Sequence, residues 1–299
     1  MAINTAHLNI RCAVYLPLFA PFGHPRIIAE LALDAEQAGW DGVFVWDDVA
    51  GWDKDMADPW IALSAAAMVT ERVRLGALIT PLPRRRPWKF ARETASLDQL
   101  SNGRLVVGVG VGAGQEQFGD LGDEPDQRTR GEMLDEALEV VTGLWHGETF
   151  EYAGRYYRLK PTTFRPRPIQ QPRIPIWVAG RRPNKRPVQR MAHWDGMFPL
   201  FGGMGDPAEQ PALLRQMVID VQSQRAALLG KDVQRSFDVV VSGETPANWP
   251  DGAEEVIAGN AAAGATWWLE SLDPQRSNGA IWSFEQLRER VLAGPLGRN

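Results

Sequence analysis

A group of basic residues in the second half of the chain has the composition of an anion-binding site. It lies in WVAGRRPNKRP, residues 177–187, where an apolar strand pattern ends in Ala179-Gly180. The basic side chains that follow are Arg181, Arg182, Lys185 and Arg186. Backbone N–H groups at a strand end, together with guanidinium groups at the start of the next helix, suit a terminal phosphate. The alternative interpretation is a solvent-exposed basic surface that binds no ligand. A second basic segment, PLPRRRPWKFAR at 81–92, is either a similar anion site or an exposed loop.

A run of alternate glycines lies in RLVVGVGVGAGQEQF, residues 104–118. Read from Gly108, it matches the dinucleotide-binding pattern G-x-G-x-x-[GA] through Gly110 and Ala113. That pattern also needs a helix that opens inside it and a second strand soon after, but turn residues and a proline follow here. Alternate glycines, Gly112 included, also leave one face of a strand end without side chains. Either a flat ring system lies against the backbone there or the strand packs tightly.

Carboxylates follow two of the strand patterns. Asp47 and Asp48 end DGVFVWDD at 41–48, and Glu116 follows the glycine run. These three are the candidate catalytic residues, since a positioned carboxylate can hydrogen-bond a ring or exchange a proton with a substrate. An aspartate after a strand can equally cap the next helix or face solvent. We expect no metal site, because the four histidines are dispersed and no HxH or HExxH spacing occurs.

The composition excludes several classes of protein. The formal net charge of −5 argues against nucleic acid or an anionic membrane as the main partner. Cys12 is the only cysteine, so neither an intrachain disulfide nor a CxxC pair is possible, and a reducing cytoplasm fits. The chain has no apolar run of ~18 residues, and its first residues lack a signal-peptide pattern, so we expect a cytoplasmic protein without a membrane span.

Strand and helix patterns alternate along the chain. β-rich apolar segments begin near residues 11, 41, 72 and 104, a spacing of about 31 residues, as expected for a strand, a helix and two short loops. Further strand patterns are IPIWVAG at 174–180, DGMFP at 195–199, SFDVVVSG at 236–243 and ATWWLES at 265–271. The last helix pattern opens at Ser283-x-x-Gln286, a capping box. Eight such units favour a closed (β/α)8 TIM barrel over a doubly wound sheet.

One segment interrupts the alternation. Residues of about 147–173 are rich in proline and aromatic side chains, with a hairpin-like turn near Ala153-Gly154. We expect an insertion after the fourth helix in a single domain, residues 1–299. In a barrel the carboxyl ends of all strands meet at one mouth, which would gather Trp46, the two aspartates and the glycine run.

Several segments resemble the bacterial luciferase-like flavin-dependent oxidoreductases. The block LGALITPLPRRRPWKFARETASLDQLSNGRLVVGVGVG is similar to a hallmark of that family, with LDQLSNGR as its specific element. QFGDLGDEPDQRTRGEMLDEALEVVTGLW, AGRYYRL, PRPIQQPRIPIWVAG and HWDGMFP match further family segments in the right order. The resemblance covers about residues 10–200. It implies a TIM barrel with an insertion and a flavin-type cofactor across the mouth.

The resemblance also implies site roles. The bond between Ala77 and Leu78 matches a non-proline cis peptide that forms a bulge behind the flavin ring, and Ala179, Gly180 and Arg181 match a phosphate loop. The full set of expected cofactor-binding residues is Trp46, Asp47, Ala77, Leu78, Thr80, Gly110, Gly112, Ala179, Gly180, Arg181 and Arg182.

Two departures from the family pattern bear on the cofactor. Members that use the deazaflavin coenzyme F-420 often have Asp-His where this chain has Asp47-Asp48. An acidic residue is sometimes found where this chain has Ala113. The resemblance therefore favours FMN, reduced by a separate reductase, with O2 and a small organic substrate as partners. Deazaflavin-dependent hydride transfer and a non-catalytic flavin-binding protein stay as alternatives. A homodimer is the implied assembly.

Overall fold

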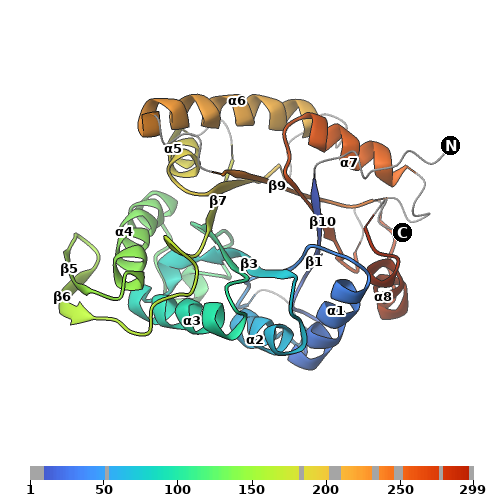
Figure 1. Cartoon of the computed structure of the whole chain (residues 1–299), viewed down its shortest axis with the longest axis horizontal. Coiled ribbons are helices and arrows are strands. Elements are labelled where there is room, and N and C mark those ends of the chain that lie inside the picture. Colours follow the sequence, from blue (N-terminus) through green and yellow to red (C-terminus); the bar gives the residue numbers. More distant parts are fainter. Residues whose placement is uncertain are drawn as a thin grey trace.

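The computed structural model describes residues 10–50, 54–181, 185–201, 210–230, 236–245, 252–275 and 279–295. Eight parallel strands close into a barrel in the order β1-β10-β9-β8-β7-β4-β3-β2 (Figure 1). These strands are β1 (Arg11–Leu16), β2 (Gly42–Val45), β3 (Arg74–Pro81), β4 (Leu105–Gly110), β7 (Ile176–Gly180), β8 (Gly196–Pro199), β9 (Asp238–Gly243) and β10 (Trp267–Ser271). Closure confirms the TIM barrel and excludes the doubly wound sheet.

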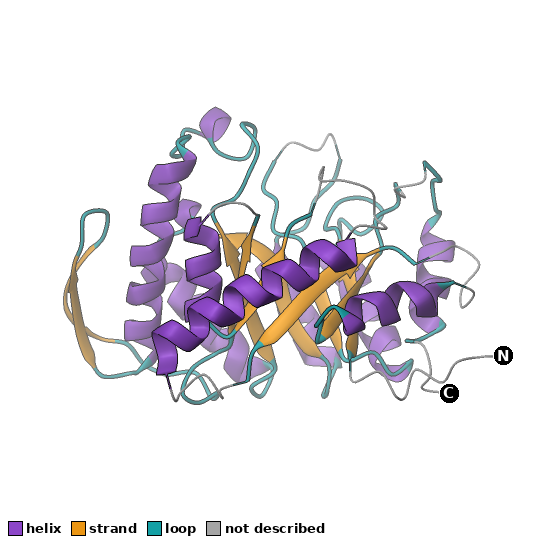
Figure 2. Cartoon of the chain, turned by 90° about the horizontal axis from the view of Figure 1, so that it is seen from above, coloured by secondary structure: helices purple, strands orange, loops and turns teal. Residues whose placement is uncertain are grey.

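Helices surround the strands in the outer layer (Figures 1 and 2). They are α1 (Pro25–Gln37), α2 (Pro59–Val69), α3 (Pro87–Leu100), α4 (Gln127–Trp145), α5 (Lys185–His193), α6 (Gln210–Leu229), α7 (Ala253–Ala262) and α8 (Phe284–Leu292). Proline at the first position opens α1, α2 and α3, where its missing N–H costs nothing. The capping box predicted at Ser283 and Gln286 is confirmed. None of the described helices is both long and apolar enough to cross a bilayer.

The buried side chains form two layers. One fills the barrel interior, with Phe44, Trp177 and Trp267 at its centre. The other lies between the strands and the helices and includes Trp268. Trp267 and Trp268 are neighbours on β10 and belong to different layers, because successive side chains of a strand point to opposite faces. Burial on both faces explains why these strands read as unbroken apolar runs.

The predicted insertion after the fourth helix is confirmed. β5 (Thr149–Ala153) and β6 (Arg158–Thr163) form an antiparallel hairpin on the outer side of α4 (Figures 1 and 2). Glu136 of α4 accepts hydrogen bonds from backbone N–H groups in the hairpin turn, and the Tyr152 hydroxyl donates to Glu139 over 3.0 Å. The hairpin therefore packs on α4.

The register between β3 and β4 changes near the mouth. Ala77 pairs with Val107, but the next pair is Thr80 with Val109, so two residues of β3 face Gly108 alone. This is a β-bulge. A Cβ on Gly108 would lie 2.1 Å from Leu78 Cδ2 and 2.7 Å from the Ala77 carbonyl oxygen. The tight-packing interpretation of the glycine run therefore holds at Gly108.

This contact predicts the effect of a single methyl group. Gly108→Ala should lower the free energy of unfolding by about 1–3 kcal/mol, because the added Cβ meets backbone as well as a side chain. Urea unfolding followed by circular dichroism measures the change.

Gly259→Ala is the matched control. This glycine lies within α7, and its added Cβ would come no closer than 3.7 Å to a Pro211 atom. Alanine is the better helix former, so we expect a gain of about 0.5–1 kcal/mol there. Equal losses at both positions would contradict the role given to Gly108.

Candidate functional site

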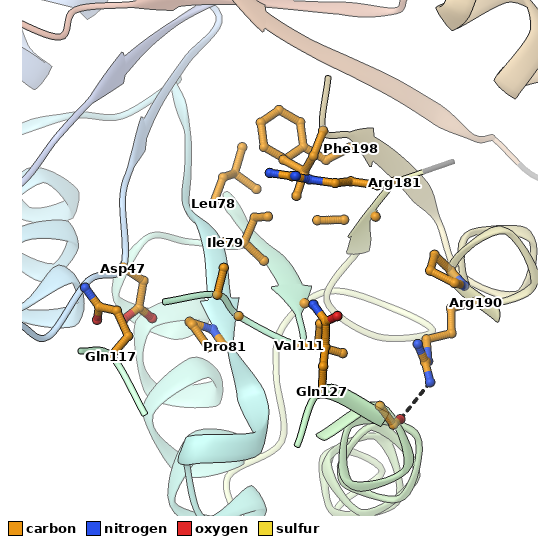
Figure 3. Close-up of a pocket in the computed structure, with 18 of the residues that line it drawn as sticks. Asp47, Leu78, Ile79, Pro81, Val111, Gln117, Gln127, Arg181, Arg190 and Phe198 are labelled. Carbon is orange, nitrogen blue, oxygen red and sulfur yellow. Dashed lines mark hydrogen bonds between the residues drawn. The ribbon is translucent and has the colours of Figure 1, made fainter. Parts of the chain in front are cut away.

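A cavity of about 1180 Å³ opens at the carboxyl ends of the barrel strands. One part of its wall is apolar, made by Tyr15, Leu78, Ile79, Phe198 and Leu200. Another part carries cations from the end of β7, from α4 and from α5: Arg128, Arg181, Lys185, Arg186 and Arg190. Figure 3 shows Asp47 and Gln117 at the left and Arg190 at the right, with Leu78 and Ile79 between them, Phe198 above and Gln127 below.

The bulge in β3 supplies part of the apolar wall. Leu78 and Ile79 both line the cavity, and a Cβ on Gly110 would lie 3.0 Å from Ile79 Cγ2. The peptide bond between Leu78 and Ile79 is cis. The predicted position, between Ala77 and Leu78, is therefore wrong by one residue, because the two bulged residues are those that face Gly108.

Asp47 is buried and fully engaged. It is 3% exposed, and its carboxylate accepts hydrogen bonds from Arg84 at 2.9 Å and from Arg85 at 2.9 and 3.0 Å. Arg84 also donates to the Asp47 backbone carbonyl over 2.7 Å. Burial is the main reason why the pKa of the Arg84 guanidinium lies below its ordinary value, and Asp47 opposes that shift. Arg84 and Arg85 of the segment PRRRP are thus engaged by Asp47 and do not form an exposed loop, whereas Arg86 is exposed.

Gln117 extends this network to a third loop. Its side-chain oxygen accepts from the Val49 N–H at 2.9 Å and from Arg84 at 3.2 Å, while its amide donates to the Ala50 carbonyl. The loops after β2, β3 and β4 are therefore joined beside the cavity. Sequence reasoning missed Gln117, because its partners lie 33 to 68 positions away and no local pattern marks them.

Except for Arg190, the cations of the wall are held less tightly than Arg84 and Arg85. Arg128 and Arg186 each lie 3.7 Å from Glu132, and their side chains are 77% and 55% exposed. Arg190 donates to the Gly131 carbonyl over 2.7 Å and pairs with Asp135. Within the described part of the chain, Arg181 and Lys185 form no ion pair. These two cations are available to an anionic group.

The other predicted site residues divide into three groups. Trp46, Asp48, Gly110, Gly112, Ala179 and Gly180 line the cavity. Ala77 and Thr80 are fully buried outside its wall, where the Thr80 hydroxyl has no partner among the described residues, and Glu116 is exposed outside it. Ala77 packs in the layer facing the helices because it precedes the bulge. Arg182 lies outside the described residues.

The arrangement suits a planar ring with an anionic tail. The bulge and Phe198 offer an apolar surface, and Arg181 and Lys185 offer positive charge in the same cavity. A ring buried against apolar atoms gains from the hydrophobic effect, while a phosphate gains charge-assisted hydrogen bonds. Among the described residues, no group of three or more His, Cys, Asp or Glu side chains lies close enough to hold a metal ion.

The Asp47 network predicts a stability effect. Asp47→Asn leaves two largely buried guanidinium groups without their counter-ion, so the free energy of unfolding should fall by about 3–5 kcal/mol. Glu93→Gln is the control, because Glu93 pairs with Lys89, whose side chain is 67% exposed, and an exposed pair contributes about 0–1 kcal/mol. Urea unfolding compares the two. Unchanged stability in Asp47→Asn would contradict this assignment.

Comparison with known proteins agrees with the barrel fold. The sequence model described as Luciferase-like monooxygenase matches residues 16–273 of this chain. The oxygenase component of a flavin-dependent trigonelline monooxygenase from Acinetobacter baylyi is 33% identical over 155 residues, covering 52% of this chain and 43% of the relative. An F420-dependent glucose-6-phosphate dehydrogenase from Nakamurella multipartita is 34% identical over 166 residues, covering 53% of this chain and 48% of the relative. The matched region thus spans less than half of either relative.

A solved structure extends the similarity over nearly the whole fold. An F420-dependent secondary alcohol dehydrogenase in complex with an F420-acetone adduct superposes with a TM-score of 0.75 and 17% identity, covering 97% of this chain and 99% of that one. At this identity the likeness establishes the fold alone. The family match over residues 16–273 carries the conclusion that this chain belongs to the luciferase-like monooxygenase family.

Proposed function

We propose that this chain is a flavin-dependent monooxygenase that uses reduced FMN and O2 on a small organic substrate. The observation that carries the proposal is that one cavity is lined by both an apolar bulge and a group of cations. FMN has the matching division, a planar ring and a terminal phosphate. Leu78 and Ile79 would support the ring, and Arg181, Lys185 and the backbone at Gly180 would hold the phosphate.

The residues of the wall fit a reaction in which the cofactor carries the chemistry. Reduced FMN, when bound, supplies the electrons that activate O2. Phe198, Leu200 and the bulge exclude water from the reacting space. No histidine lines the cavity within the described ranges. Its carboxylates there are Asp47, which is ion-paired, and Asp48, which would hydrogen-bond the substrate. This favours oxygenation over an alcohol dehydrogenation that needs a dedicated base.

The trigonelline relative supports this proposal, because it is the oxygenase component of a flavin-dependent monooxygenase. A separate reductase would then supply the reduced FMN. The second candidate, hydride transfer with deazaflavin, is supported by the F420-dependent glucose-6-phosphate dehydrogenase of similar identity. The homodimer, the single domain and the cytoplasmic location stay predictions.

Binding of the cofactor is the first test. Wild-type protein should bind FMN, and Arg181→Ala should raise the dissociation constant about 10- to 100-fold, because a hydrogen bond to a charged group contributes about 1.5–3 kcal/mol. Quenching of flavin fluorescence gives both constants. Arg158→Ala on the hairpin changes the net charge equally, far from the cavity wall, and should bind like wild type. Binding of deazaflavin alone would contradict the FMN proposal and move the assignment to hydride transfer.

Turnover separates the enzyme from a flavin carrier. With FMN, a flavin reductase, NADH and 18O2, we expect one 18O atom in the product of at least one member of a panel of small aldehydes, ketones and N-heterocycles. Mass spectrometry of the products provides the measurement, with Arg181→Ala at subsaturating FMN as the control. FMN binding without label in any product of a broad panel would favour the non-catalytic flavin-binding alternative.

A further inference from the structure

Tyr15 connects the cavity wall to the bulge. It lies in β1, lines the cavity, and donates a hydrogen bond from its hydroxyl to the Leu78 backbone carbonyl. Because β1 pairs with β2 and β2 with β3, the side chain reaches past β2 to make this contact. Its ring lies 6.0 Å from the Trp46 ring and packs edge-on against Phe198 at 6.1 Å, measured between centroids. The hydroxyl is thus held in an aromatic environment beside the proposed ring site.

The bulge is anchored twice at Leu78. The side chain occupies the space above Gly108, with Cδ2 2.1 Å from the place of a Cβ on that glycine. The Leu78 carbonyl oxygen accepts a hydrogen bond from the Tyr15 hydroxyl. The first contact fixes where the bulge sits along β4, and the second fixes the direction of the peptide that joins Leu78 to Ile79. Ile79, which lines the cavity, takes its orientation from that peptide.

We propose that Tyr15 is a positioning residue for the cofactor ring and acts through the Leu78 carbonyl. The proposal rests on the proposed function, in which the ring lies against Leu78 and Ile79. Functional groups must be held to about 0.5 Å to work, and hydrogen bonds from residues behind them provide that precision. A wall formed by a bulge has lost regular ladder hydrogen bonds, so a side-chain donor takes over part of their role.

The protonation state of Tyr15 suits this role. Burial and, to a smaller extent, the negative charge of Asp48 raise the pKa of the phenol above its ordinary value. The phenol therefore stays neutral at physiological pH and remains a donor. Its proton is committed to the Leu78 carbonyl, so Tyr15 orients the wall and transfers no proton.

A pair of hydroxyl deletions tests the proposal. Tyr15→Phe removes the hydroxyl and keeps the ring. Tyr157→Phe is the matched control, because Tyr157 is 4% exposed, lies outside the cavity wall and has a hydroxyl without a partner among the described residues. Hydrogen exchange of the protein without cofactor reports on β3, and titration with FMN gives the dissociation constant and the absorption spectrum of the bound ring.

We expect Tyr15→Phe to exchange faster in residues 74–81 while the rest of the barrel is unchanged, which also shows that the variant folds. Its dissociation constant for FMN should rise about three- to tenfold, the effect of one lost hydrogen bond, and the spectrum of bound FMN should shift. Tyr157→Phe should match wild type in all three measurements.

The contrary results are distinct. Faster exchange with an unchanged spectrum and dissociation constant would make the hydroxyl structural only and overturn the proposal, as would wild-type behaviour in all three measurements. If wild-type protein itself binds no FMN, the proposed function fails, and that result does not depend on the comparison between the variants. The exchange experiment uses no cofactor, so the link from Tyr15 to the bulge is still decided.

Discussion

Two residues of β3 face Gly108 of β4, and the geometry of the site depends on this mismatch. Any side chain at Gly108 would collide with Leu78 and with the Ala77 carbonyl. Because the extra residue is accommodated there, Ile79 lies in the cavity wall while Thr80 resumes the pairing with Val109. A shift of one residue exchanges the two faces of a strand, so the bulge determines which side chains at the end of β3 face the cavity. Arg84 and Arg85 come three and four residues after the end of β3, so the position of the bulge also affects where they lie.

The two parts of the cavity are held by different kinds of interaction. Near Asp47 the polar groups are largely buried and hydrogen-bonded. Arg84 and Arg85 donate to the Asp47 carboxylate, and Arg84 also donates to the Gln117 side-chain oxygen. Burying such charges costs desolvation free energy. Because few other arrangements would pair these charges, the network fixes the loops after β2, β3 and β4. By contrast, Arg128 and Arg186, which line the cavity, lie 3.7 Å from Glu132 and are largely exposed. Such pairs contribute little and can rearrange around a ligand.

The sequence allowed the barrel to be predicted more completely than the site. Eight apolar runs at regular spacing are enough to indicate the strands, because burial on both faces leaves a continuous signal that does not depend on any one contact. The bulge was misplaced by one residue, since its position depends on how Leu78 packs over Gly108, 30 positions away. Asp47 lines the cavity, as the sequence predicts, but its ion pairs with Arg84 and Arg85 could not be read from any local pattern. Tyr15 resembled any aromatic core residue, because its partner is a backbone carbonyl that no residue type reveals.

The contrast between a fixed wall and an adjustable cationic end bears on how the family selects its cofactor. An apolar bulge recognises the shape of a tricyclic ring, and flavin and deazaflavin rings share that shape. The wall alone therefore discriminates poorly between them, which agrees with the presence of flavin-dependent and F420-dependent proteins among the relatives of this chain. The two coenzymes differ more in the groups attached to the ring than in its outline. Discrimination between the two coenzymes should therefore depend on Arg181, Lys185 and the exposed arginines of α4 and α5. Because these side chains are weakly paired, substitutions among them can change the charges of the cavity without disturbing the barrel.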